Sequence, residues 1–161
     1  MKIHAIAVGG TIDKIYFDAK SKYEVGEPAV LKMLDDLPIN IDVEVTPLMA
    51  KDSLDMTEQD RSIVREAVIQ SSASKILITH GTDTMPETAR SLANISGKTV
   101  VLTGALQPAV FKDSDAQFNI GGALAALQAI HEGVYIVMNG QLFDGLNVKK
   151  DRSLNRFLAI E

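Results

Sequence analysis

The fold is decided by residues 75–103, which read KILITHGTDTMPETARSLANISGKTVVLT. Two nearly continuous apolar runs, residues 76–78 and 100–102, flank a helix candidate at Thr84–Ala93 that carries Pro86 in its first turn. Continuous apolar runs of this kind are typical of strands that are covered on both faces. A strand, a helix and a second strand in succession predict parallel strands joined by a crossover helix.

The same alternation continues along the chain in both directions. Short apolar runs predict strands at Ile3–Val8, Asp42–Val45, Lys75–Thr79, Thr99–Thr103 and Val134–Met138. Helical patterns predict helices at Pro28–Leu37, Thr57–Gln70, Thr84–Ala93 and from Ser114 or Asp115 to Ile130. We therefore expect an α/β fold: a doubly wound, mostly parallel sheet with helices on both faces.

The helix predicted at Thr57–Gln70 carries local signals of its own. Thr57 is a suitable N-cap, and Ile63, Ala67 and Val68 form a one-sided apolar stripe.

The composition excludes several classes of protein. The chain has 161 residues and is 46% hydrophobic, which suits one domain with a real core rather than a disordered chain. Its 16 basic and 21 acidic residues give a net charge of −5, and only 5% of residues are aromatic, so we expect no nucleic-acid partner.

Metal and membrane association are not expected either. With 0 Cys there is no disulfide framework, thiolate nucleophile or cysteine zinc site, and the 3 His lie far apart. No stretch approaches the roughly 18 apolar residues of a membrane helix. We therefore predict a cytoplasmic protein.

The loops that follow the strands are the places to search for a site, because parallel sheets bind ligands at the carboxyl ends of their strands. These loops hold much of the hydroxyl, amide and charged chemistry of the chain. They are Gly9–Glu24, Leu48–Met56, His80–Asp83, Gly104–Asp113 and Asn139–Lys150.

Several residues in these loops suit nucleophilic catalysis. Gly9-Gly10 allows a tight turn or a close approach, and it places Thr11 just past a strand. Thr82 and Asp83 exceed what capping of the next helix requires, although Asp83 or Thr84 could serve as that cap. Without cysteine, a threonine could be activated by a lysine base and an orienting aspartate.

A lysine in the last loop, Lys149 or Lys150, has two interpretations. It is either a solvated surface charge or, if it is buried beside a hydroxyl and a carboxylate, a general base.

Four segments resemble the signatures of one family. They are Gly9-Gly10-Thr11-Ile12, Tyr23-Glu24-Val25-Gly26, His80-Gly81-Thr82-Asp83-Thr84-Met85, and Asp144-Gly145 followed by Lys150. Supporting matches are Ser53-x-Asp55-Met56, Thr103-Gly104-Ala105 and Asp115-x-x-x-Asn119. The chain thus resembles the bacterial-type L-asparaginase family, the asparaginase/glutaminase group with a threonine nucleophile, and specifically its N-terminal domain.

The resemblance implies hydrolysis of L-asparagine to L-aspartate and ammonia through an acyl-enzyme. Thr11 is then the nucleophile on a mobile loop, and Tyr23 closes over the substrate. Thr82, Asp83 and Lys150 form a second triad that positions water or activates the hydroxyl. The spacing from Asp144-Gly145 favours Lys150 over Lys149 as the catalytic lysine.

The resemblance also implies how the substrate is bound. Ser53 would hold the α-carboxylate and Asp83 the α-amino group, with Gly81 as a further binding residue. The substrate is L-asparagine and possibly L-glutamine, and neither a metal nor an organic cofactor is needed.

The chain departs from the family pattern in length and at two positions. The family's common chain is about twice as long, so we expect a short form in which residues 1–161 are a single catalytic domain and the C-terminal domain is absent. We then expect a homo-oligomer, a dimer or tetramer, to cover the site. Leu54 stands where Gln or Ser is usual, and Ala116 stands where Gly is usual.

Three other functions are compatible with the residues. Leu54 and the missing domain allow a glutaminase or another small-amide amidohydrolase. A module that binds an amino acid but has lost useful catalysis belongs to a different class. A plain α/β domain with capped helices and no site leaves the six-residue match at 80–85 unexplained.

Overall fold

The computed structural model describes residues 1–161 and is built on one six-stranded sheet in the order β4-β1-β5-β6-β7-β8. Its first five strands are parallel, and β8 adds antiparallel to β7. The strands are β1 (Lys2–Gly9), β4 (Asp42–Lys51), β5 (Lys75–Thr79), β6 (Thr99–Thr103), β7 (Gly133–Met138) and β8 (Gln141–Asp144). The predicted doubly wound, mostly parallel sheet is confirmed.

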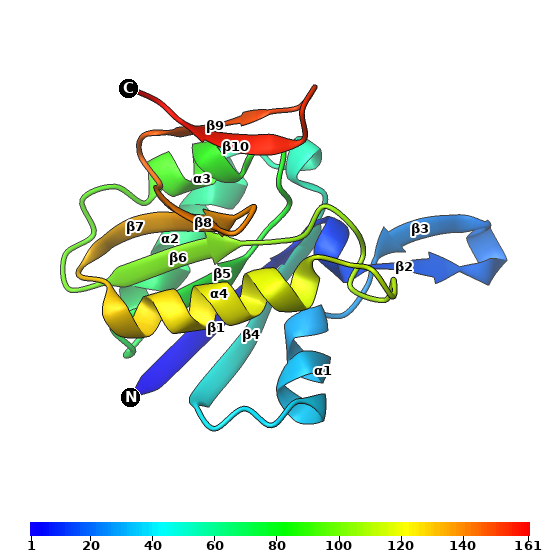
Figure 1. Ribbon diagram of the computed structural model, residues 1–161, viewed down its shortest axis with the longest axis horizontal. Helices are drawn as coiled ribbons and strands as arrows, with labels where there is room; N and C mark the ends of the chain where they lie inside the picture. The colour runs from blue at the N-terminus through cyan, green and yellow to red at the C-terminus, as the bar shows by residue number, and fades with distance from the viewer.

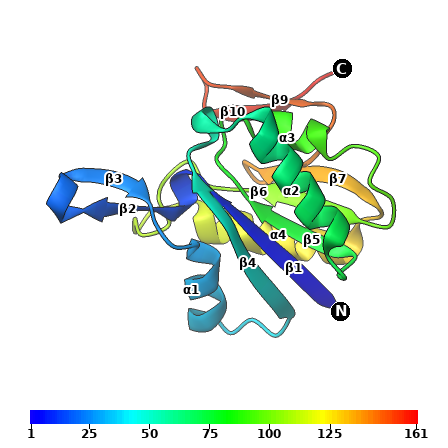
Figure 2. The ribbon, with the colours of Figure 1, turned by 180° about the vertical axis from the view of Figure 1, so that it is seen from behind.

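Helices cover both faces of this sheet. The helices are α1 (Ala29–Asp36), α2 (Glu58–Gln70), α3 (Met85–Ser91) and α4 (Ala116–Ala129). Helices α1 and α4 pack on one face and α2 and α3 on the other, as the two opposite views show (Figures 1 and 2). Each face has its own core, because strand residues alternate sides: Leu77 joins the core under α4, while Ile76 and Ile78 join the core under α2 and α3.

Strands β2 (Lys14–Phe17) and β8, and most of β3 (Lys22–Val25) and β9 (Val148–Asp151), fall in segments that were predicted as loops, and two hairpins are formed outside the main sheet. One is formed by β2 and β3, and it projects away from the sheet (Figure 1). The other is formed by β9 and β10 (Arg156–Ala159), and it packs on the side of α3. Strand β4 also runs to Lys51, beyond the predicted end at Val45.

The structure confirms the N-cap of α2 and corrects its apolar stripe. The Thr57 hydroxyl accepts a hydrogen bond from the Asp60 amide, and the Asp60 carboxylate accepts from the Thr57 amide, which is a capping box. Ile63 is 41% exposed, so its place in the predicted stripe is wrong. Val64 and Val68, four residues apart, are the side chains that face the sheet.

Candidate active site

Three loops meet at the carboxyl end of the sheet because glycines allow their backbones to touch. A Cβ on Gly10 would lie 2.3 Å from the Cα of Gly81, and a Cβ on Gly81 would lie 2.6 Å from the Cβ of Ser53. Gly10 also has a φ of +92°, which favours glycine. The close approach allowed by Gly9-Gly10 is therefore real. It brings together the loops that carry Thr11, Ser53 and Thr82.

Thr82, Asp83 and Lys150 form a compact hydrogen-bonded cluster. The Lys150 Nζ donates to the Thr82 Oγ1 at 2.7 Å and to the Asp83 Oδ1 at 2.7 Å. Only 6% of the Lys150 side chain and 30% of the Asp83 side chain are exposed, and Thr82 is buried. A solvated surface charge therefore does not describe Lys150, whereas its neighbour Lys149 is exposed.

The hairpin of β9 and β10 delivers Lys150 to this cluster. Lys150 lies opposite Phe157 in the antiparallel pair, and Phe157 is anchored in the core with 1% exposure. Arg152, in the hairpin turn, places its Nε 3.7 Å from the same Asp83 oxygen. A strand anchored in the core through Phe157 thus holds the lysine against residues that lie 67 and 68 positions earlier in the chain.

His80 fixes the loop that carries the cluster. Its Nδ1 lies 2.6 Å from the Gly81 carbonyl oxygen and its Nε2 lies 2.8 Å from the Thr88 hydroxyl. Because a carbonyl can only accept, we assign the proton to Nδ1, which leaves Nε2 to accept from Thr88. Burial lowers the pKa of His80 to about 4, so the ring is neutral near pH 7 and acts as a structural clamp.

Ser53 is buried, and both its hydroxyl and its carbonyl oxygen form hydrogen bonds with Thr84. The Thr84 amide donates to the Ser53 Oγ at 3.3 Å, and the Thr84 hydroxyl donates to the Ser53 carbonyl oxygen at 2.8 Å. Thr84 occupies the N-cap position of α3 as predicted, but its side chain makes no cap hydrogen bond there. Asp52, next to Ser53, accepts from the Leu54 amide and pairs with Lys14 at 2.9 Å.

The two remaining predicted residues lie in different settings. Thr11 directly follows Gly10 and begins a short 3₁₀ turn, Thr11–Asp13, beside the Gly81 loop. Tyr23 lies on the projecting hairpin and is 48% exposed. Its ring packs against Tyr16 and Phe111 at centroid distances of 5.4 and 5.7 Å. The structure therefore groups Thr11, Ser53, Gly81, Thr82, Asp83 and Lys150 at one end of the sheet and leaves Tyr23 outside that group.

Asp13, like His80 described above, has a structural role that the sequence did not reveal. Asp13 is 3% exposed, and its Oδ1 accepts a hydrogen bond from the Ala29 amide at 2.8 Å. Burial raises the pKa of Asp13 to about 7. The signal available in the sequence was a single carboxylate between Ile12 and Ile15, close to an apolar strand.

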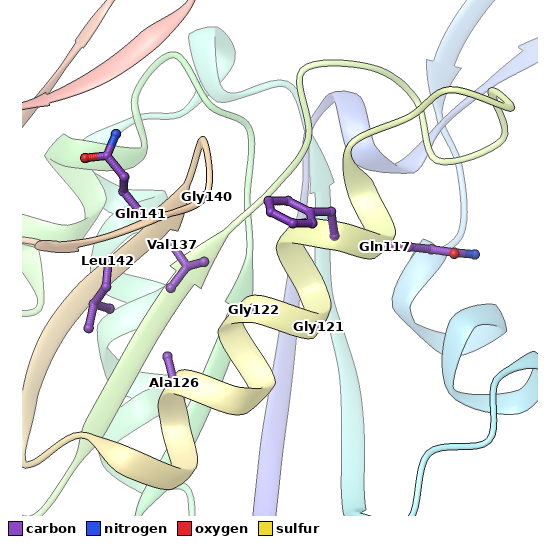
Figure 3. Close-up of a pocket in the computed structure, with 9 residues that line it drawn as sticks. Gln117, Gly121, Gly122, Ala126, Val137, Gly140, Gln141 and Leu142 are labelled. Atoms are coloured by element: carbon purple, nitrogen blue, oxygen red, sulfur yellow. The ribbon is translucent and has the colours of Figure 1, made fainter.

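The larger surface pockets lie away from the cluster. One of about 510 Å³ lies between α4 and the turn from β7 to β8, where Gly122 packs against Val137 (Figure 3). Another of about 470 Å³ opens between the Thr11–Asp13 turn and α1. Neither is lined by Thr82, Asp83 or Lys150.

The described chain holds no group of three or more acidic or histidine side chains placed to bind a metal ion. None of its helices combines the length and the apolar character that crossing a membrane requires.

The fold and site define an α/β protein with a threonine–lysine–aspartate cluster at the carboxyl end of a parallel sheet. The family model described as "Asparaginase, N-terminal" matches residues 2–159, so the chain belongs to the asparaginase family.

Relatives of known name agree with this assignment. L-asparaginase 2 of Escherichia coli is 32% identical over 164 residues, which cover 92% of this chain and 46% of that protein. The solved structure of the thermostable L-asparaginase from Thermococcus kodakarensis matches with a TM-score of 0.87 at 27% identity, over 99% of this chain and 51% of that one. A glutamyl-tRNA(Gln) amidotransferase component of Methanococcus vannielii is 38% identical over 97 residues, 55% of this chain and 23% of that protein. The chain spans about half the length of the L-asparaginases it matches.

Proposed function

We propose that the protein hydrolyses the side-chain amide of L-asparagine and releases ammonia and L-aspartate. The observation that carries this proposal is the position of the Lys150 Nζ, 2.7 Å from both the Thr82 hydroxyl and the Asp83 carboxylate in a buried setting. A lysine in that position can exchange a proton with a hydroxyl while the carboxylate stabilises the ammonium form.

The proposed reaction is a double displacement with Thr11 as the nucleophile. The Thr11 oxygen attacks the amide carbon, the carbon–nitrogen bond breaks, and the threonine proton passes to the nitrogen, which leaves as ammonia. Water then attacks the ester on Thr11 and returns a proton to the threonine oxygen as L-aspartate leaves. Thr82, Lys150 and Asp83 move the protons in these steps, and Lys150 must be neutral when it accepts one.

Substrate binding is proposed for the same end of the sheet. Ser53 binds the α-carboxylate, and Asp83 binds the α-ammonium through the oxygen that Lys150 does not occupy. Gly81 contributes its backbone to the same binding site, next to Ser53. Tyr23 closes the site only if the β2–β3 hairpin moves, because its ring now packs on Tyr16 and Phe111.

The test is ammonia release by the wild type and by Thr11→Ala. The wild type is expected to turn over L-asparagine, and Thr11→Ala should lose about 10³-fold or more in kcat, since members of a catalytic unit act together. Unchanged turnover in Thr11→Ala would remove Thr11 as the nucleophile. Binding of L-aspartate by calorimetry without turnover in the wild type would instead favour a binding module.

L-glutamine is the second candidate substrate. Leu54, which is 56% exposed beside Ser53, offers no side-chain hydrogen bond to the amino acid. One relative is named as part of a glutamyl-tRNA(Gln) amidotransferase. The ratio of kcat/KM for the two amides decides between them.

The assembly and domain content also remain proposals. We propose that residues 1–161 form one catalytic domain, and that a dimer or tetramer covers the open side of the site. Sedimentation equilibrium measures the assembly, and a monomer that turns over L-asparagine would contradict the need for a covering protomer. The cytoplasmic location stays a prediction.

A further inference from the structure

Asp13 ties the turn that carries Thr11 to the start of a helix. The turn Thr11–Asp13 directly precedes β2, and the Asp13 side chain is 3% exposed. Its Oδ1 accepts the amide of Ala29, the first residue of α1, at 2.8 Å. A carboxylate at a helix N-terminus also interacts favourably with the helix dipole.

The backbone of Asp13 makes two further connections. Its amide donates to the Gly10 carbonyl oxygen at 3.1 Å, which closes the turn around Thr11. Its carbonyl oxygen accepts from the Gly26 amide at 2.8 Å, which closes the base of the β2–β3 hairpin. One residue therefore joins the Thr11 turn, the hairpin that carries Tyr23, and α1, which are neighbours in Figure 1.

The carboxyl group of Asp13 has no ion-pair partner. It lies in the wall of the pocket of about 470 Å³, whose other charged lining residues are Lys14, Glu27, Lys32 and Asp36. Lys14 pairs with Asp52 and Lys32 pairs with Asp36. The β6–α4 loop and α4 line the pocket with the uncharged Ala109, Val110 and Gln117. Burial therefore governs the protonation of Asp13 and raises its pKa to about 7, against the opposing effect of the Ala29 hydrogen bond.

We infer that Asp13 is a positioning residue for Thr11: its buried carboxylate holds the Thr11 turn against the N-terminus of α1 and thereby sets the direction of the Thr11 hydroxyl. The inference rests on the proposed role of Thr11 as the nucleophile. A hydrogen bond to a charged acceptor is roughly twice as strong as one to a neutral acceptor, so protonation of Asp13 weakens its bond to the Ala29 amide even though it relieves the burial of a charge. Activity should then fall as the pH drops through about 7.

The first test compares Asp13→Asn with Asp36→Asn, a matched change of an exposed acid in the same pocket. Asp13→Asn should lower kcat by about 10²-fold with little change in KM, because a small misplacement of a reacting group has an effect of that order. It should also abolish the inflection near pH 7 in the kcat profile. Asp36→Asn should leave both unchanged. An Asp13→Asn enzyme with wild-type kcat and pH profile, in a protein where Thr11→Ala is inactive, would overturn the inference and leave the proposed function standing.

The second test needs neither a variant nor activity. In a ¹⁵N NMR titration of the wild type, the Ala29 amide should shift with a midpoint near pH 7, and the Thr11 and Ile12 amides should shift with the same midpoint. Thr11 and Ile12 signals that stay fixed while Ala29 titrates would show that the carboxylate does not control the turn, and the inference would fail. If the protein releases no ammonia from either amide, the proposed function fails, and this titration still decides whether Asp13 positions Thr11.

Discussion

Two lysine–threonine contacts lie at opposite ends of the same parallel strands. At the carboxyl end, the Lys150 Nζ meets the Thr82 hydroxyl at 2.7 Å and the Asp83 carboxylate at 2.7 Å. At the amino end, the Lys75 Nζ meets the Thr99 hydroxyl at 3.3 Å and the carbonyl oxygen of Ile130 at 3.0 Å. The residue types are the same, but the third partner is a carboxylate in one case and a helix-end carbonyl in the other.

We infer that the lysine at the carboxyl end serves the proposed chemistry, whereas the lysine at the amino end makes only structural hydrogen bonds. A carboxylate can stabilise a lysine through a cycle of proton transfer, whereas a carbonyl at the end of a helix only needs a donor. Lys98, also at the amino end, donates to the Ser71 and Ala73 carbonyl oxygens in the same structural way. The amino end therefore supplies matched controls for substitutions at the carboxyl end.

The largest expected effect is on activity, in the pair Lys150→Met and Lys75→Met. Lys150→Met should reduce ammonia release by about 10²- to 10⁴-fold, the usual contribution of general acid–base catalysis. Lys75→Met should leave turnover within about twofold, because its partners are structural. Steady-state kinetics of the two folded variants measure this, and equal losses in both would erase the distinction between the two ends.

The next effect is a pH dependence of stability with opposite signs at the two ends. Burial raises the pKa of Asp13 from 3.8 to about 7, so its contribution is fully present below pH 3.8 and is lost as the pH rises through 7. Three pKa units correspond to about 4 kcal/mol of unfolding free energy.

Burial lowers the pKa of His4, at the start of β1, from 6.5, so its contribution is present above pH 6.5 and is lost as the pH falls. In urea unfolding from pH 4 to 8, Asp13→Asn should remove a loss of stability that the wild type shows as the pH rises from about 4 to 7. His4→Gln should instead remove a loss of stability that appears as the pH falls below 6.5. If each variant instead removed the pH trend assigned to the other residue, that result would contradict the burial of one or both side chains.

A smaller effect is expected from alanine at one glycine of each end. A Cβ on Gly81 meets Ser53 at 2.6 Å, and a Cβ on Gly97 meets nothing within 4 Å but has to adopt a φ of +74°. Both variants should lose about 1–3 kcal/mol of stability, by overpacking and by backbone strain respectively. Ammonia release should fall only in Gly81→Ala, because only that change displaces Ser53. A Gly81→Ala enzyme with normal KM would mean that the close approach is not part of the site.

The smallest effect is expected from Thr57→Ala at the N-terminus of α2. Loss of the capping box should cost about 1 kcal/mol in unfolding free energy. The kcat should not change, because the Thr57 hydroxyl lies at the carboxyl end of the sheet but only caps α2. Thermal unfolding followed by ammonia assays checks both, and a loss of kcat at full folding would extend the site to α2.

Much of the fold was predictable because its signals are local. The buried strands at 75–79 and 99–103 were predicted with the correct bounds, since each is a nearly continuous apolar run with polar ends. The β2–β3 hairpin was missed because Lys14–Phe17 has no buried side chain and so no alternation to detect. The Ile63 error arose because the sequence gives the period of a helix but not which side meets the sheet.

The candidate site divides in the same way. Thr11 and Thr82 could be singled out from the sequence because each lies just past a predicted strand. The partnership of Lys150 with Asp83 spans 67 residues, and only the resemblance to a family suggested it before the structure showed the contact. Asp13 could not be assigned, because its partner is a backbone amide 16 residues away that carries no sequence signal.

The most direct test of the central claim is ammonia release from L-asparagine by Thr82→Val and Thr99→Val in parallel. Both changes remove one buried hydroxyl that is bonded to a lysine, at opposite ends of the sheet. The account predicts that Thr82→Val loses about 10²- to 10⁴-fold in kcat while Thr99→Val keeps wild-type turnover. Turnover that survives in Thr82→Val, or that is lost equally in both variants, would contradict the assignment of the Thr82–Lys150–Asp83 cluster to the chemistry.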